Sequence, residues 1–136
     1  MASSVFVGFF ERQRTHRDGD AMRPLYFIGS AHADLKSLPG KAQRDIGFAL
    51  YEAQLGSKSS FAKPLKGFHG AGVLEIVENF DGDTFRAVYT VRFKQAVYVL
   101  HVFQKKSKRG IETPKSDMNL IGARLKVAEL DAKAKE

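Results

Sequence analysis

The stretch DGDTFRAVYTVRFKQAVYVLHVF, residues 81–103, decides the fold of this chain. It opens with an Asp-Gly turn signal, alternates in polarity over residues 84–93, and becomes more apolar over residues 95–103. Alternation with a period of two is typical of strands, and Asp-Gly favours a tight hairpin. Residues 73–79, just before the turn, also show a strand pattern. Because the connections are short, we predict an antiparallel meander of three strands.

Helical segments precede this meander. An apolar strand over residues 25–29 leads to Ser30, a suitable N-cap for a short helix over residues 31–38. A Pro-Gly break follows, and then a longer helix over about residues 41–55 with an apolar stripe. The stretch GSKSSFAKP, residues 56–64, is typical of a loop.

A further helical pattern follows the meander. Thr113 is expected to cap this helix, with Pro114 at its first position. The element order β-α-α-β-β-β-α predicts an α+β fold in which the helices pack on one face of a small sheet. The opposite face of the sheet, which carries Arg86 and Arg92, is then expected to remain open.

The composition indicates one domain. The 136 residues suffice for a single core, and residues 23–136 are predicted to form it, with Met22 as the native start. Residues 1–22 are polar and aperiodic towards their end, which indicates a flexible N-terminal extension. No apolar run reaches the roughly 18–20 residues of a membrane span, and no signal peptide is evident. The absence of cysteine excludes disulfides and thiolate metal sites and fits a cytoplasmic protein.

The net charge of +7 is concentrated in one part of the chain. Residues 84–111 contain seven basic side chains and no acidic one, whereas the rest of the chain carries as many acids as bases. The seven are Arg86, Arg92, Lys94, Lys105, Lys106, Lys108 and Arg109. A field concentrated in this way attracts polyanions, and nucleic acid is the first candidate.

Other candidate sites are weaker. The four histidines, His16, His32, His69 and His101, lack the spacing of a metal site, so we expect neither a metal nor another cofactor. His101 lies in the apolar third strand, where a structural role competes with catalysis. The Gly-rich stretch GFHGAG lacks the ending of a phosphate loop. The carboxylates around the turn, Glu75, Glu78, Asp81 and Asp83, are interpreted as a solvated hairpin end.

The basic run after the third strand has two interpretations. Lys105, Lys106, Lys108 and Arg109 could form a solvated loop or an anion site. The hairpin register would bring Arg86 to the same end of the sheet as Lys105 and Lys106, which favours phosphate recognition. Arg86 and Lys106 are both expected to be exposed, so alanine variants should lose function while remaining folded.

These segments resemble a known family. TFRAVYTV and LHVFQKKSKRGIETP, followed by a helix, are similar to the RelE/ParE superfamily of bacterial toxins, and most similar to its phage-derived HigB-like branch, which typically reads yRvlY…LHgFxKKtxktP. Arg86, Tyr89, His101, Lys105 and Lys106 fall at matching positions, as do Leu100, Phe103 and Pro114. The similarity extends over about residues 24–130.

The resemblance implies a metal-independent endoribonuclease that cleaves mRNA, usually on the ribosome, and that a helix-turn-helix antitoxin neutralises. By matching position, Arg86 and Lys106 would hold the scissile phosphate, and Lys105 would assist. His101 is the candidate general base. The expected RNA-binding residues are Lys66, Arg92, Lys108 and Arg109.

The sequence departs from the branch at two places. The branch usually has WELR on the second strand, whereas this chain has Leu74-Glu75-Ile76-Val77, so the basic residue is missing at Val77. The glycine after His101 is Val102, and RGIE lengthens the next loop. Two alternatives therefore remain: a ParE-type toxin that inhibits DNA gyrase on the same scaffold, or a nucleic-acid-binding module without catalysis.

Overall fold

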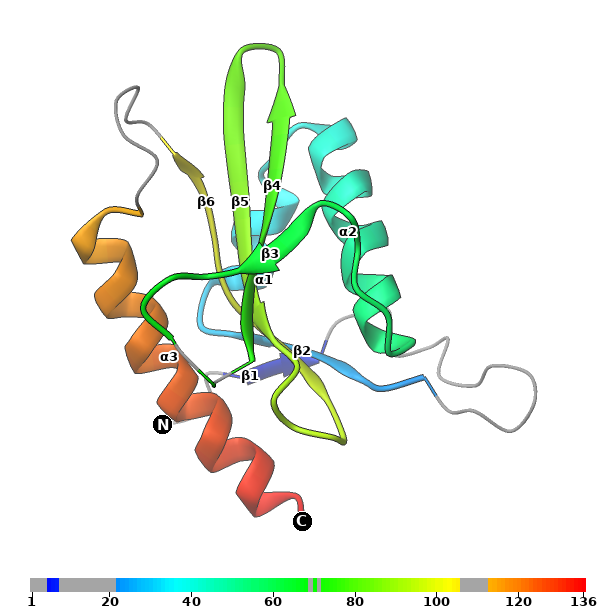
Figure 1. Ribbon diagram of the computed structural model, residues 1–136, viewed down its shortest axis with the longest axis vertical. Coiled ribbons are helices and arrows are strands. Elements are labelled where there is room, and N and C mark those ends of the chain that lie inside the picture. Colours follow the sequence, from blue (N-terminus) through cyan, green and yellow to red (C-terminus); the bar gives the residue numbers. More distant parts are fainter. Residues whose placement is uncertain (1–4, 8–21, 69, 71, 106–112) are drawn as a thin grey trace.

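A mixed sheet of six strands forms the centre of the protein, with the spatial order β1-β2-β6-β5-β4-β3 (Figure 1). The structure, a computed structural model, describes residues 5–7, 22–68, 70, 72–105 and 113–136, and the numbers of strands and helices refer to these residues. The strands are β1 (Val5–Val7), β2 (Leu25–Ile28), β3 (Ala62–Pro64), β4 (Val73–Phe80), β5 (Asp83–Thr90) and β6 (Val97–Lys105). Only the β2–β6 pair is parallel.

The Asp-Gly turn fixes the register of the central hairpin. Asp81 and Gly82 both have positive φ angles, 53° and 84°, as the favoured two-residue hairpin turn requires. In the resulting register Val77 lies opposite Arg86. The predicted meander is present as β4, β5 and β6, but it forms half of a larger mixed sheet.

Two strands were absent from the expected element order. Residues 56–64 were predicted to form a loop, yet β3 pairs antiparallel with β4 because buried Ala62 joins the core opposite Ile76. Within residues 1–22, expected to be a flexible extension, Val5–Val7 pair with β2 and Met22 is buried. The other residues of that segment lie outside the described part of the chain.

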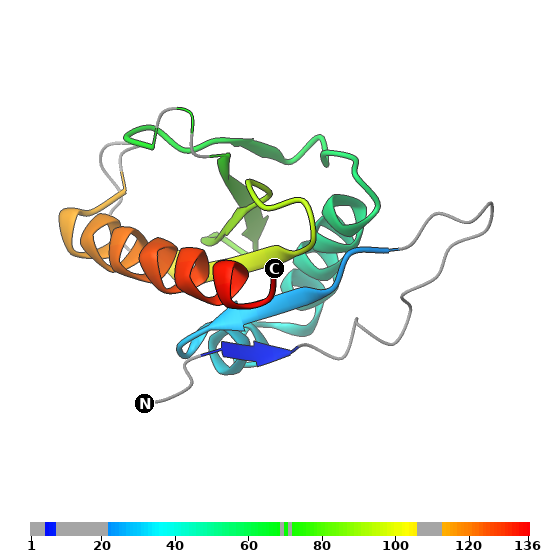
Figure 2. The ribbon, with the colours of Figure 1, turned by 90° about the horizontal axis from the view of Figure 1, so that it is seen from below.

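The three helices cover both faces of the sheet. They are α1 (Ala31–Lys36), α2 (Gly40–Gln54) and α3 (Lys115–Ala134). Helices α1 and α2 lie on one side and α3 lies on the other (Figure 2). The α+β class is confirmed, but the placement of all helices on one face is wrong. The N-cap of α3 is Pro114 rather than Thr113.

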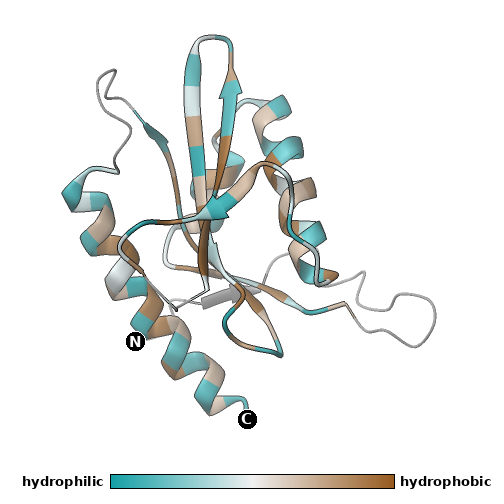
Figure 3. Ribbon diagram, viewed as in Figure 1, coloured by the Kyte–Doolittle hydropathy of each residue, from teal (hydrophilic) through white to brown (hydrophobic). Residues whose placement is uncertain are grey.

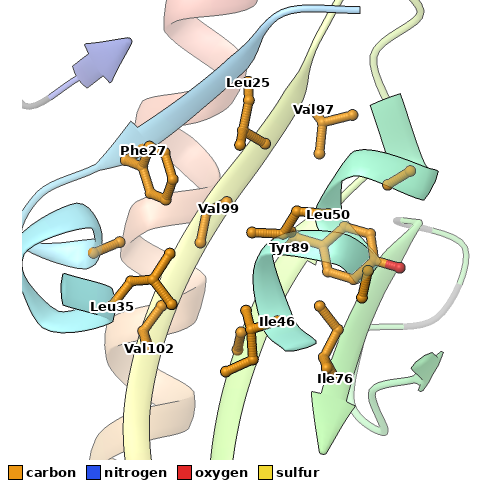
Figure 4. Close-up of a cluster of buried hydrophobic side chains, with 14 of the residues drawn as sticks. Leu25, Phe27, Leu35, Ile46, Leu50, Ile76, Tyr89, Val97, Val99 and Val102 are labelled. Carbon is orange, nitrogen blue, oxygen red and sulfur yellow. The ribbon is translucent and has the colours of Figure 1, made fainter. Parts of the chain in front are cut away.

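The larger core lies between the sheet and the α1–α2 pair (Figure 4). Ile46 and Leu50 of α2 and Leu35 of α1 pack onto Tyr89 and Val99 of the sheet. Hydrophobic and hydrophilic residues alternate in bands along α2 and α3, as amphipathic helices require (Figure 3). Tyr89 is buried, its hydroxyl has no hydrogen-bond partner among the described residues, and burial raises its pKa to about 12.

A second core lies between the sheet and α3. Ile121 and Leu125 pack against Val88 and Leu100 because the apolar stripe of α3 needs a partner surface, and the face predicted to be open provides it. A hydrogen bond also holds the C-terminal part of α3 against the sheet. Tyr98 Oη donates to Asp131 at 2.6 Å, and burial together with this contact raises the pKa of the Tyr98 hydroxyl.

Among the described residues, no helix is both long and apolar enough to cross a membrane.

Candidate active site

Polar and charged side chains gather on the α3 side of strands β4, β5 and β6. Side chains opposite each other on neighbouring strands share a face of the sheet. Glu75, Val88 and His101 therefore form one row across these strands, and Arg86 and Phe103 belong to the adjacent row. Helix α3 covers the β6 side of this surface.

Glu75 and Arg86 form a buried ion pair. Their side chains are only 4% and 9% exposed, and Arg86 Nη1 lies 2.5 Å from Oε2 and 3.0 Å from Oε1 of Glu75. The pair runs diagonally across the hairpin. Arg86 lies opposite Val77, and Glu75 is two residues before Val77, so Glu75 and Arg86 share one face of the sheet. Arg86 Nε has no hydrogen-bond partner among the described residues. The guanidinium thus retains one buried donor that no described group uses.

His101 and Asp117 form a second polar pair. His101 is 7% exposed, its Nε2 lies 2.7 Å from Oδ1 of Asp117 on α3, and its ring stacks on Phe103 with centroids 4.5 Å apart. His101 Nδ1 has no partner among the described residues. The carboxylate accepts a hydrogen bond from Nε2–H, which orients the ring and leaves Nδ1 unused by the described residues.

A β-bulge places His101 on this face. Val88 pairs with His101 and Tyr89 pairs with Val99, so Leu100 is the extra residue of β6. Leu100 packs in the α3-side core, and His101 next to it contacts Asp117 of α3. Strict alternation would have turned His101 towards α2. Bulges commonly redirect side chains in this way near active sites.

A pocket opens beside the ion pair. Its volume is about 510 Å³, and it lies between the segment around β3 and the start of α3. Its lining residues are Lys63, Pro64, Leu65, Lys66, Gly67, Glu75, Thr113, Lys115 and Met118. Glu75 therefore contributes both to the buried ion pair and to the pocket wall.

Comparison with protein families found one match, described as "Phage derived protein Gp49-like (DUF891)", over residues 33–126. The match covers more than two thirds of the chain. The chain belongs to the Gp49-like family. This family is part of the RelE/ParE-like toxin superfamily, which confirms the resemblance in LHVFQKK and its surroundings. It is a toxin-like family, and a toxin implies an antitoxin partner. Comparison with curated proteins gave no match.

The matched region of this Gp49-like protein contains all eight residues of the predicted site. Lys105 is buried at the end of β6, opposite Thr84 and two residue pairs along the strand from Arg86. Lys66 lines the pocket. Lys106, Lys108 and Arg109 lie outside the described residues, so their roles stay predictions.

Two expectations about the arginines of the Gp49-like protein need correction. Arg86 is buried rather than exposed, because its guanidinium forms an ion pair with the buried carboxylate of Glu75. Strand β5 ends at Thr90, and Arg92 lies beyond it at the end of the sheet opposite Lys105. Arg92 contacts Glu129 of α3 at 2.5 Å, so the structure does not bring it together with the other site residues.

The sequence pattern of the Gp49-like protein did not reveal four side chains at the site: Glu75, Asp117, Lys63 and Lys115. Glu75 was grouped with the carboxylates of a solvated hairpin end. The register set by the Asp-Gly turn could have revealed it, since that register puts Glu75 on the face of Arg86. Asp117 carried no such signal, because its contact with His101 depends on where α3 docks. Within the described residues no cluster of histidine and acidic side chains could hold a metal ion.

Proposed function

We propose that this Gp49-like protein is the toxin of a toxin–antitoxin pair and a metal-independent endoribonuclease that cleaves mRNA on the ribosome. The observation that carries the proposal is the presence of Glu75, Arg86 and His101 on one face of the sheet, each held by a polar partner. Such a set supplies the three things that RNA cleavage by the 2′-hydroxyl needs: a proton acceptor, a proton donor and a cation.

The reaction requires two proton transfers. The 2′-hydroxyl oxygen bonds to the adjacent phosphorus and loses its proton, and the bond from phosphorus to the 5′-oxygen breaks as that oxygen gains a proton. The products carry a 2′,3′-cyclic phosphate and a 5′-hydroxyl. Attack and departure occur on opposite sides of phosphorus, so the two transfer groups must flank the phosphate.

Glu75 and His101 meet this geometric requirement. They lie in one row on strands β4 and β6, with β5 between them, so their Cα atoms are about 10 Å apart at the usual strand spacing. An ionised carboxylate can only accept a proton, so we assign acceptance to Glu75. Donation is assigned to the imidazolium form of His101, which carries a proton on Nδ1 for the leaving oxygen while its Nε2–H bonds to Asp117. This reverses the role of general base that the sequence suggested for His101.

The cations stabilise the charge that develops on the phosphate. Arg86 lies beside Glu75 and keeps an unused, buried Nε donor, and Lys105 lies two residue pairs further along the sheet on the same face. Donors held in place before the reaction need little reorganisation when the phosphorane forms. Lys106 is proposed to hold the scissile phosphate together with Arg86, and Lys108 and Arg109 to bind flanking RNA. Val77 lies opposite Arg86, so the cation missing at that position leaves Arg86 the central phosphate contact.

Primer extension on mRNA after induction of the toxin tests this proposal. The wild-type protein should produce discrete cuts at positions occupied by ribosomes, and His101→Gln should abolish them. His32→Gln is the matched control, because His32 lies on α1 at the opposite face and its substitution should leave the cuts in place. Intact mRNA with trapped gyrase would instead identify a ParE-type toxin, and intact mRNA without trapped gyrase would leave only nucleic-acid binding.

A further inference from the structure

The pocket between β3 and α3 has an unusual balance of charge. Lys63, Lys66 and Lys115 line it, all three are exposed, and none forms an ion pair with another residue in the described part of the chain. The one carboxylate in the lining, that of Glu75, is neutralised by Arg86. The pocket therefore carries an uncompensated positive charge, which favours an anionic ligand.

One part of the pocket wall is apolar. Pro64, Leu65 and Met118 contribute to the lining, and a Cβ atom on Gly67 would lie only 2.9 Å from the Met118 Cε atom. The segment after β3 thus contacts α3 closely at this side of the pocket, and the ribbon shows that segment passing beside α3 (Figure 1). An apolar wall beside unpaired lysines suits a ligand with a flat, weakly polar part and a charged part.

The size of the pocket limits the ligand to a small unit. A volume of about 510 Å³ lies within the range of roughly 300–1,000 Å³ that is typical of small-molecule sites. Inorganic phosphate would use the lysines but leave the apolar wall uncovered. A nucleotide matches both features, because its base can cover the wall while its phosphate contacts the lysines.

We propose that this pocket binds one nucleotide of the RNA substrate, with the base against Leu65 and Met118 and a phosphate between Lys63, Lys66 and Lys115. The assignment rests on the proposed function, since Glu75 is shared between the pocket and the catalytic row. A nucleotide held in this pocket lies directly beside the Glu75–Arg86 pair. The pocket thus sets which phosphate of the chain reaches that pair.

Calorimetric titration of the full-length protein with adenosine 5′-monophosphate tests the pocket directly. The nucleotide should bind saturably at millimolar concentration, and both inorganic phosphate and adenosine should bind more weakly. The Lys63→Gln/Lys66→Gln double variant should weaken nucleotide binding about tenfold, since each lysine contact contributes about twofold to fivefold. Lys126→Gln is the control, because it removes one lysine charge outside the pocket, from a position on α3 about 16 Å along the helix from Lys115.

A trinucleotide with 2′-deoxyriboses, which the enzyme cannot cleave, distinguishes RNA from a free nucleotide. It should bind about tenfold more tightly than the mononucleotide, because its neighbouring phosphate reaches Arg86. Equal binding of the two would overturn the assignment to an RNA chain, and equal binding of phosphate and nucleotide would overturn the role of the apolar wall.

The two proposals fail in different ways. Absence of saturable nucleotide binding, or an equal loss of affinity in Lys126→Gln, would refute the pocket assignment even if mRNA cleavage were intact. Nucleotide binding that depends on Lys63 and Lys66 in a protein that leaves mRNA intact would support the pocket and refute only the nuclease.

Discussion

The buried ion pair between Glu75 and Arg86 offers the most direct test of the site. Replacing Arg86 with Met keeps much of the side-chain volume and removes the charge. The carboxylate of Glu75, 4% exposed, then loses the Nη1 donor that lies 2.5 and 3.0 Å from its two oxygens. Breaking a buried pair by removing one partner costs about 3–5 kcal/mol of the free energy of unfolding.

A double-mutant cycle separates the cost of leaving one buried charge without its partner from the net contribution of the ion pair to the free energy of unfolding. Glu75→Leu should also destabilise by about 3–5 kcal/mol, because it leaves the guanidinium buried without its partner. The double variant Arg86→Met/Glu75→Leu should lie close to the wild type, since apolar replacement of a buried pair is often neutral. The coupling energy should therefore be several kcal/mol.

Urea denaturation followed by circular dichroism provides the assay. Arg92→Met is the matched control, because Arg92 and Glu129 form an ion pair whose side chains are 46% and 40% exposed, and its loss should cost less than about 1 kcal/mol. If Arg86→Met cost no more than Arg92→Met, or if the two single effects at the buried pair simply added, Arg86 would not be the buried partner of Glu75. The expectation that Arg86→Ala leaves folding unchanged is replaced by this one.

Further predictions concern pH, two tyrosines and the histidine pair. Burial, together with a hydrogen bond to Asp45 and the charge of that carboxylate, raises the pKa of Glu78 from 4.5 to about 7. The folded chain therefore keeps a proton that the unfolded chain loses, and stability should fall by about 2–3 kcal/mol as the pH rises from 4.5 to 7. Urea titrations across this range should show a smaller fall for Glu78→Gln than for the wild type. Tyr98→Phe should cost about 1 kcal/mol of the free energy of unfolding, because the Tyr98 hydroxyl bonds to Asp131. Tyr89→Phe should cost nothing, because the Tyr89 hydroxyl has no partner among the described residues. Equal melting temperatures of the two variants in thermal denaturation would contradict this. Asp117→Asn should lower cleavage about tenfold or more. Nitrogen NMR of the neutral His101 ring should show the Nε2–H tautomer in the wild type and a mixture of tautomers in the variant.

Much of the fold follows from local sequence signals. The Asp-Gly turn predicted the β4–β5 hairpin, and the alternation after it separates Arg86 from Phe85 and Ala87, which the structure places in the core beside α2. The apolar spacing around Ile46 predicted α2 within one residue at each end. Strand β3 escaped prediction because three residues carry too little periodicity, and it forms only by pairing with β4.

The site was predicted only in part. The charge excess and the LHVFQKK segment led to Arg86, His101 and Lys105, which the structure places on one face. Glu75 was overlooked because a carboxylate near a turn is usually solvated, and its burial depends on the guanidinium opposite. Asp117 lies on α3, far along the chain, and only the docking of that helix brings it to His101.

By itself the sequence determined the three helices, the strands β2, β4, β5 and β6, and the pairing in the hairpin, because period and turn chemistry are local properties. Tertiary structure alone decided three matters: that α3 covers the second face, that Arg86 is buried, and that His101 points towards α3. The apolar stripe of a helix specifies that it must be covered but not by which face. The direction of His101 depends on the extra residue at Leu100, and a bulge is specified by pairing between strands rather than by either strand alone.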